Sequence, residues 1–145
     1  MTRRLVTVAL SLTALAGAAW FLYDPPWVAT YTSGLLNWEE EPPGVRLRWT
    51  KGHATFFVPS AAAGMTLPLR SWFPGPGGAP VVVSISVDDR FIAIVTLPNA
   101  REWVSTTLPL PRGATHRRSR RVDLHVSRIV PPFGLGVELG EVRAR

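Results

Sequence analysis

A long apolar run near the start of the chain is its clearest pattern. Arg3 and Arg4 are followed by nineteen residues without a formal charge, 5–23. At a rise of about 1.5 Å per residue the run measures roughly 28 Å as a helix, close to the apolar thickness of a bilayer. Trp20 and Tyr23 end the run, and amphipathic aromatic residues concentrate at membrane interfaces. The pattern predicts a single transmembrane helix over residues 5–23.

The charges beside this run predict its orientation. The positive flank, residues 1–4, is expected to stay in the cytoplasm, which leaves the rest of the chain on the far side. Small residues at 14–16 and 17–19 also fit a cleavage site, so a cleaved signal is the alternative. The apolar run continues past both sites, which favours an uncleaved signal anchor. We therefore expect a single-pass protein of the cytoplasmic (inner) membrane whose bulk is periplasmic or extracellular.

From residue 45 onward the pattern changes to short apolar segments separated by turn residues. Val81, Val83 and Ile85 alternate with Ser84 and Ser86, which is the period of an antiparallel strand with one buried face. The segments predict an all-β domain over residues 45–145, an antiparallel jelly-roll-like β-sandwich of about eight strands. They cover residues 45–49, 54–58, 65–71, 81–87, 91–97, 102–108, 121–127 and 135–142.

Two of these segments carry further expectations. Residues 91–95 are apolar on both faces, which favours a central strand. Asp88 and Asp89 precede this segment and predict a hairpin turn to the strand before it. Pro68 cannot donate a ladder hydrogen bond, so its strand is expected at an edge or with a bulge.

Residues 24–44 form a connector between the helix and the sandwich. Asp24 is followed by two prolines, which end the helix. Trp27, Tyr31 and Trp38 make the connector too apolar for a free linker. It is expected either to lie along the membrane surface or to dock on the sandwich.

Composition and charge narrow the function classes. The chain has no cysteine, which excludes a disulfide framework, a thiolate metal site and a cysteine nucleophile. The net charge of +6 favours acidic partners such as anionic lipid or an acidic polymer. An exported domain has little access to nucleic acid, so we expect no nucleic-acid partner.

No catalytic arrangement stands out, and we expect neither enzyme activity nor a cofactor. The three histidines, His53, His116 and His125, are not spaced as a metal pair. Asp88 and Asp89 are weak calcium candidates and more often simply form turns. A glycosidase needs two facing carboxylates. Nothing in the sequence marks a pair among the candidates Glu102, Asp123, Glu138 and Glu141.

Two surface features are candidate ligand-binding sites. Trp72 and Phe73 precede a Pro-Gly loop, and exposed aromatic faces suit the apolar face of a sugar ring; Trp49 and Trp103 are instead expected in the core. A basic loop offers guanidinium forks that match phosphate and carboxylate groups. A solvated loop with no ligand is the alternative interpretation. The loop arginines are Arg112, Arg117, Arg118, Arg120 and Arg121.

The order of certain motifs adds a resemblance. The chain has Arg-Trp-Thr at 48–50, Leu-Pro-Leu-Pro at 108–111, and a closing stretch rich in turn and core residues at 127–139. Over residues 45–142 it resembles the jelly-roll domain at the exported C-terminal end of some bacterial membrane-embedded sugar transferases. That family usually has an acidic-Arg turn where this chain has Pro-Phe-Gly, 132–134. The resemblance implies an exported sandwich and carries over no catalytic residues.

These observations lead to one functional hypothesis and two alternatives. The hypothesis is a membrane-anchored, non-catalytic sandwich that acts as an accessory or glycan-binding module in cell-envelope polysaccharide metabolism, held in lipid by residues 5–23. The first alternative is an interaction subunit that docks on a multi-pass membrane transferase through the aromatic residues of the connector. The second is an anionic-lipid-binding domain that uses the arginine-rich loop.

Overall fold

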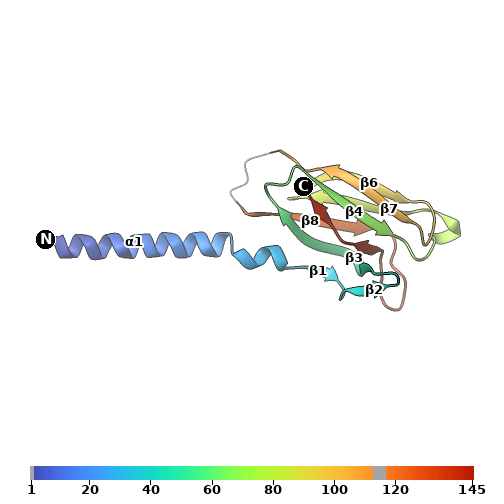
Figure 1. Cartoon of the computed structure of the whole chain (residues 1–145), viewed down its shortest axis with the longest axis horizontal. Helices are drawn as coiled ribbons and strands as arrows, with labels where there is room; N and C mark the ends of the chain where they lie inside the picture. The colour runs from blue at the N-terminus through green and yellow to red at the C-terminus, as the bar shows by residue number, and fades with distance from the viewer. Residues whose placement is uncertain (1, 113–116) are drawn as a thin grey trace.

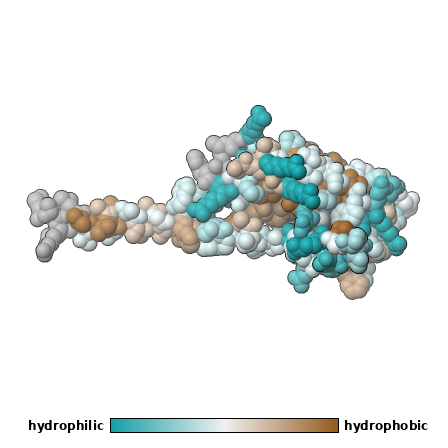
Figure 2. Space-filling view, viewed as in Figure 1, coloured by the Kyte–Doolittle hydropathy of each residue, from teal (hydrophilic) through white to brown (hydrophobic). Residues whose placement is uncertain are grey.

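The protein consists of an N-terminal helix that projects from a β-sandwich (Figure 1). The computed structural model describes residues 2–112 and 117–145. Helix α1 spans Thr2–Tyr23, which confirms the predicted helix. Its described side chains are exposed, and the segment Val6–Thr30 is long and apolar enough to cross a membrane. Figure 2 shows apolar side chains along the helix and strongly hydrophilic ones gathered on the sandwich.

In the described residues ten strands follow the helix, together with two short 3₁₀ helices. The 3₁₀ helices are η1 (Pro26–Thr30) and η2 (Pro76–Gly78). The strands are β1 (Ser33–Leu35), β2 (Glu39–Glu41), β3 (Val45–Pro59), β4 (Gly64–Arg70), β5 (Val81–Val87), β6 (Arg90–Leu97), β7 (Trp103–Pro109), β8 (Ser119–Val126), β9 (Glu138–Gly140) and β10 (Arg143–Ala144).

Strand β3 belongs to both layers of the sandwich. Its first half pairs with β2 and β9. In the same layer β4 pairs with β9, β7 and β10, and we call this layer the β4 sheet. The second half of β3 pairs with β1 and β8, and β8 continues through β5 to β6; this layer is the β5 sheet. All these ladders are antiparallel, so the predicted all-β antiparallel fold is confirmed.

The core lies between the two sheets and follows the period of the strands. Met65, Leu67 and Leu69 of β4 point inward from one sheet, and their exposed areas are 1% or less. From the other sheet the alternating residues Val83 and Ile85 of β5 meet them in one contiguous cluster. Since alternate residues of a strand point to opposite faces, Thr66, Pro68 and Arg70 lie on the outer face of β4.

The segments expected at 45–49 and 54–58 form one strand rather than two. Pairing continues through Thr50, whose backbone N–H donates to the carbonyl of Val137 at 2.8 Å. Its side-chain Oγ1 accepts a hydrogen bond from the Val137 N–H at 2.9 Å. Pairing with β8 then begins at His53, opposite His125, so one continuous strand β3 crosses from one sheet to the other.

One expectation about strand position was wrong, and a second held in only one of its two alternatives. Strand β6 is at an edge, because it pairs only with β5 among the described strands, and its Phe91 is 63% exposed. Strand β4 is interior rather than an edge, but the register of its partners shifts by one residue beside Pro68, between the β9 and β10 ladders, which agrees with the bulge alternative. Pro68 is tolerated there because the neighbouring ladder is interrupted, with β9 ending at Gly140 and β10 beginning at Arg143.

The turn at Asp88 and Asp89 is confirmed, and both residues have positive φ, 48° and 63°. The connector docks on the sandwich, since β1 and β2 pair with β3 and η1 packs near it. The connector therefore contributes one strand to each sheet.

Candidate functional site

A row of four large polar and aromatic side chains crosses the outer face of the β4 sheet. Trp49 of β3 lies opposite Glu138 of β9. Glu138 lies opposite Arg70 of β4, and Arg70 lies opposite Trp103 of β7. Residues that face each other across adjacent strands share a face and contact one another. Register therefore places an acid–base pair between two tryptophans.

Arg70 is the centre of this row. Its Nε donates to Glu138 Oε2, and its Nη2 donates to Glu41 Oε2 at 2.8 Å. The guanidinium carbon lies 4.5 Å from the ring centre of Trp103 and 5.3 Å from that of Trp72. Only 8% of the Arg70 side chain and 4% of the Glu138 side chain are exposed, whereas Glu41 is 39% exposed. Arg70 is therefore held rigidly by one buried and one partly exposed carboxylate.

The protonation of the pair follows from this environment. Burial alone would lower the pKa of Arg70, but hydrogen bonds and charge from Glu138 and Glu41 outweigh it and raise that pKa above its ordinary value. Burial raises the pKa of Glu138 above its ordinary value, and the Arg70 hydrogen bond offsets this only in part. Arg70 consequently stays cationic, and its hydrogen bond and charge favour the ionised form of Glu138.

A groove runs beside this row on the same face. Its residues include Pro68, Trp103, Ser105 and Gly140, and its volume is about 450 Å³. Gly140 has no side chain, and a Cβ there would lie 3.1 Å from Pro68 Cβ. The middle of the sheet therefore has a smooth floor, with Trp103 as one wall and the ion pair Arg46–Glu141, at 3.2 Å, as another.

A second pocket lies at the other side of the row. Its volume is about 360 Å³, and Trp49, Trp72, Arg70 and Glu138 line it together with residues of β2. Arg70 and Trp103 pack together between the two openings. The outer face of the β4 sheet therefore carries two adjoining concave regions with aromatic and charged walls, which we call the outer groove.

Sequence reasoning found one residue of the outer groove and misplaced two. Trp72 was a predicted ligand residue and lines the second pocket, with Arg101 stacked 4.8 Å from its ring centre. Phe73 is 39% exposed and is not among the residues that line either pocket of the groove. Trp49 and Trp103, expected in the core, are half-buried on the outer face. The outward alternation of Thr66, Pro68 and Arg70 was the available signal for Arg70.

The predicted arginine cluster is divided between two places. Arg118 lies at the end of α1, where its backbone N–H donates to Asp24 Oδ2 at 2.8 Å. Arg117 stacks 5.0 Å from the ring centre of Tyr23. Arg112 is exposed, and His116 lies outside the described residues. The remaining two arginines of the predicted cluster, Arg120 and Arg121, lie in β8.

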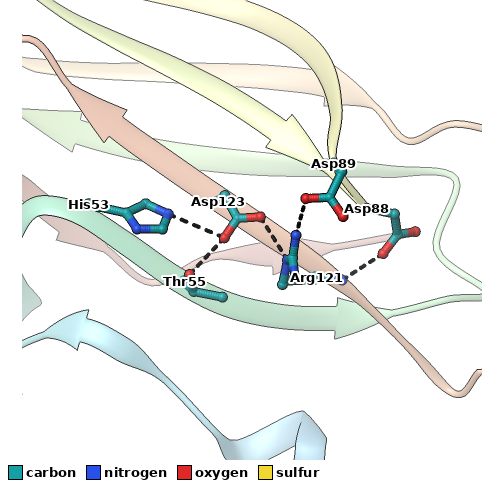
Figure 3. Close-up of polar contacts among 6 residues, drawn as sticks. All are labelled: His53, Thr55, Asp88, Asp89, Arg121 and Asp123. Carbon is teal, nitrogen blue, oxygen red and sulfur yellow. Dashed lines mark hydrogen bonds and ion pairs between the residues drawn. The ribbon is translucent and has the colours of Figure 1, made fainter.

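Figure 3 shows the second place, where aspartates surround Arg121. Arg121 donates to Asp123 Oδ2 at 2.9 Å and forms an ion pair with Asp89, while its backbone N–H donates to Asp88 Oδ1 at 3.0 Å. Arg120 is buried, and its Nη1 lies 3.9 Å from Asp88 Oδ2. The two candidate calcium ligands thus contact arginines. Among residues 2–112 and 117–145, no three His, Cys, Asp or Glu residues gather as a metal site.

A histidine also joins this network. His53 Nε2 lies 3.4 Å from Asp123 Oδ1, and Thr55 donates to the same oxygen at 2.7 Å (Figure 3). The His53 ring stacks on that of His125 at 4.3 Å. Burial alone would raise the pKa of Asp123, but hydrogen bonds from Thr55 and Arg121 and the charges of Arg121 and His53 together lower it below its ordinary value.

Comparison with known proteins gives distant structural likenesses. No protein-family model matches the chain, and the search of curated proteins found no match. One similar solved structure is the EclA C-terminal domain, a sugar-binding protein, with 15% identity, a TM-score of 0.48, and coverage of 75% of this chain and 90% of that one. Another is the C-terminal CBM6 of LamC from Zobellia galactanivorans, with 13% identity, a TM-score of 0.46, and coverage of 79% and 90%.

Proposed function

We propose that this protein is a membrane-anchored, non-catalytic β-sandwich that binds glycans of the cell envelope through the outer groove. The observation that carries the proposal is the row Trp49–Glu138–Arg70–Trp103 beside a smooth-floored groove. The apolar helix α1 would hold the sandwich at the membrane surface, with the bulk of the chain outside the cytoplasm.

The chemistry of the outer groove suits a sugar chain. A pyranose ring has an apolar face that packs on tryptophan, and its hydroxyls need donors and acceptors at the ring edge. Trp72 and Trp103 supply the aromatic surfaces, while Arg46, Glu141 and Ser105 supply polar groups at the wall. Because Arg70 stacks on Trp103 and bonds two carboxylates, this wall is rigid before a ligand arrives, which lowers the entropic cost of binding.

The same contacts favour binding over glycoside hydrolysis. A raised pKa on Glu138 is what a general acid needs. Its carboxylate, however, is almost fully buried and bonded to Arg70, and a second carboxylate, Glu41, bonds to the same guanidinium. A glycosidase instead needs two carboxylates that face each other across the substrate. The acids here hold the arginine, so we assign them a structural and positioning role.

A binding experiment on the full chain in lipid nanodiscs tests the proposal. We expect binding to members of an array of envelope polysaccharides and their oligosaccharides. Trp72→Ala and Trp103→Ala should each weaken binding at least tenfold, which corresponds to about 1.4 kcal/mol. Phe91→Ala is the matched control, because Phe91 is an exposed aromatic residue on the other sheet. Absence of binding across the array, or equal loss in the control, would contradict the proposal.

A second candidate function is docking on a multi-pass membrane transferase. Trp27 and Tyr31 of the connector are 54% and 59% exposed, and they lie four and eight residues after the end of α1. Aromatic residues are enriched at the centres of protein interfaces. Co-purification of such a transferase with the full chain, reduced by Trp27→Ala and Tyr31→Ala, would support this function. Intact co-purification by the double variant would argue against it.

A further inference from the structure

A separate pocket lies between the connector and the sandwich. Its volume is about 320 Å³, at the lower end of the range for small-molecule sites. Ala29 and Thr32 of the connector form one side. The other side is largely apolar and includes Phe56, Phe57, Val58, Pro59, Val142 and Ala144. We call this cavity the connector pocket.

A cation with an unsatisfied donor lines the connector pocket. The Nε of Arg48 is buried and has no hydrogen-bond partner in the described part of the chain. The guanidinium instead stacks 4.5 Å from the ring centre of Trp38, and burial lowers the pKa of Arg48. A buried donor without an acceptor costs free energy that a bound oxygen would recover.

The charged residues that line the connector pocket favour an anionic ligand. Arg143 lines the same pocket and adds a second cation. Among the described residues that line the pocket, Glu141 is the one acidic side chain, and its carboxylate already pairs with Arg46 at 3.2 Å. The lining thus combines two guanidinium groups with a hydrocarbon surface. Such a pocket complements a molecule with an anionic head and an apolar chain.

The position of the connector pocket suggests where that molecule comes from. Ala29 lies six residues after Tyr23, the last residue of α1, so the pocket is close along the chain to the end of the apolar helix. Glu141 and Arg143 line both the connector pocket and the outer groove. A ligand could therefore extend from the hydrocarbon-lined side, past the arginines, to the sugar-binding side.

We propose that the connector pocket binds the phosphate group and adjoining hydrocarbon chain of an anionic glycolipid. Arg48 and Arg143 bind the phosphate oxygens, and Phe57 and Pro59 pack against the chain. The inference rests on the proposed function in one respect, because the sugar of that lipid lies in the outer groove.

Photo-crosslinking of the full chain in phosphatidylcholine nanodiscs tests the inference. The probe is decyl phosphate with a diazirine on its alkyl chain, and its neutral twin carries glucose in place of phosphate. We expect the phosphate probe to label residues 56–59 or 142–144 at least fivefold more than the twin does. Equal labelling by both probes, or labelling confined to residues 5–23, would overturn the inference.

Three variants sharpen the test. Arg48→Gln should reduce labelling at least fivefold because it removes the guanidinium with its buried Nε donor, and Ala29→Trp should do the same by narrowing the pocket. Arg90→Gln is the matched control, since Arg90 is exposed at the β5–β6 hairpin. Wild-type labelling in both Arg48→Gln and Ala29→Trp would overturn the inference, because two independent changes to the lining would then have no effect.

Competition identifies the source of the anion and separates this inference from the proposed function. Unlabelled phosphatidylglycerol in the nanodisc should displace the probe, whereas inorganic phosphate at the same concentration should not. Displacement by inorganic phosphate alone would show a site for free phosphate and overturn the lipid assignment. Trp103→Ala should leave labelling by the sugar-free probe unchanged. Failure of every glycan to bind, with labelling intact, would therefore contradict the outer groove and not the phosphate-and-chain site.

Discussion

Replacing Arg70 by methionine tests whether the outer groove rests on a buried ion pair. Methionine keeps much of the apolar stem, so the change removes mainly the guanidinium and leaves the Glu138 carboxylate buried without a cation. Both side chains are at least 92% buried, 8% and 4% exposed, so the cost of breaking a buried pair applies, about 3–5 kcal/mol. Glu41→Gln should cost only about 0.5–1 kcal/mol, since Glu41 is 39% exposed.

A double variant that also replaces Glu138 provides the decisive comparison. In Arg70→Met/Glu138→Gln no buried charge remains, so we expect the double variant to recover about 2 kcal/mol of the loss. The free energy of unfolding is measured by urea titration of the full chain in neutral detergent, with tryptophan fluorescence as the signal. Trp49, Trp72 and Trp103 all adjoin the pair and report on it. A loss below about 1 kcal/mol for Arg70→Met, or no recovery in the double variant, would refute the reasoning.

The pH dependence of the stability loss in Arg70→Met provides an independent test. Burial raises the folded-state pKa of Glu138, and loss of Arg70 removes a group that lowers it, so the pKa rises further in Arg70→Met. A carboxyl group whose pKa is raised on folding favours the folded state at low pH and loses that contribution as the pH increases through the folded pKa. The loss caused by Arg70→Met should therefore shrink as the pH falls from 8 toward about 4.3, the ordinary pKa of Glu. A constant loss across this range would contradict it.

Three further predictions concern other parts of the molecule. The pKa of Asp123 is lowered on folding, so its contribution to stability is present above about pH 3.9, the ordinary pKa of Asp, and is lost as the pH falls below that value. The destabilisation caused by Asp123→Asn, measured by urea titration, should therefore shrink below about pH 3.9. Gly136→Ala should destabilise by about 1–3 kcal/mol in the same assay, because a Cβ would lie 2.6 Å from the Lys51 carbonyl oxygen. Since the chain has no cysteine, Arg90→Cys should be labelled by an impermeant maleimide on intact spheroplasts; labelling only after permeabilisation would place the sandwich in the cytoplasm.

Local patterns predicted those elements whose residue pattern does not depend on which other elements pack beside them. Strand β5 spans Val81–Val87, which matches the predicted segment, because alternation between core and outer face is a local property of the strand. Helix α1 was predicted in the same way, from the apolar run at 5–23 that contains no charged residue. Strand β6 shows the limit. Its apolar residues on both faces indicated a central position, yet Phe91 and Ile94 are exposed at a sheet edge, since strand order depends on the whole topology.

The candidate site was predictable only in part. Trp72 stood out because a tryptophan beside a Pro-Gly loop suggests an exposed aromatic face. Arg70 and Glu138 did not, because they are 68 residues apart and meet through the register of β4 and β9. The basic loop also looked like one patch of like charge. Folding paired Arg121 with Asp89 and Asp123, which a charge count along the chain does not reveal.

The order of residues by itself determined the apolar helix, the all-β character of the rest and the turn at Asp88 and Asp89, because each depends on hydrophobic period or backbone preference over a few residues. Only the tertiary structure decided that β3 joins both sheets, that three tryptophans line the outer face, and that Arg48 lines a pocket beside the connector. Those features arise from pairing between distant segments. Strand register and burial select such pairs, and neither is a property of any one segment.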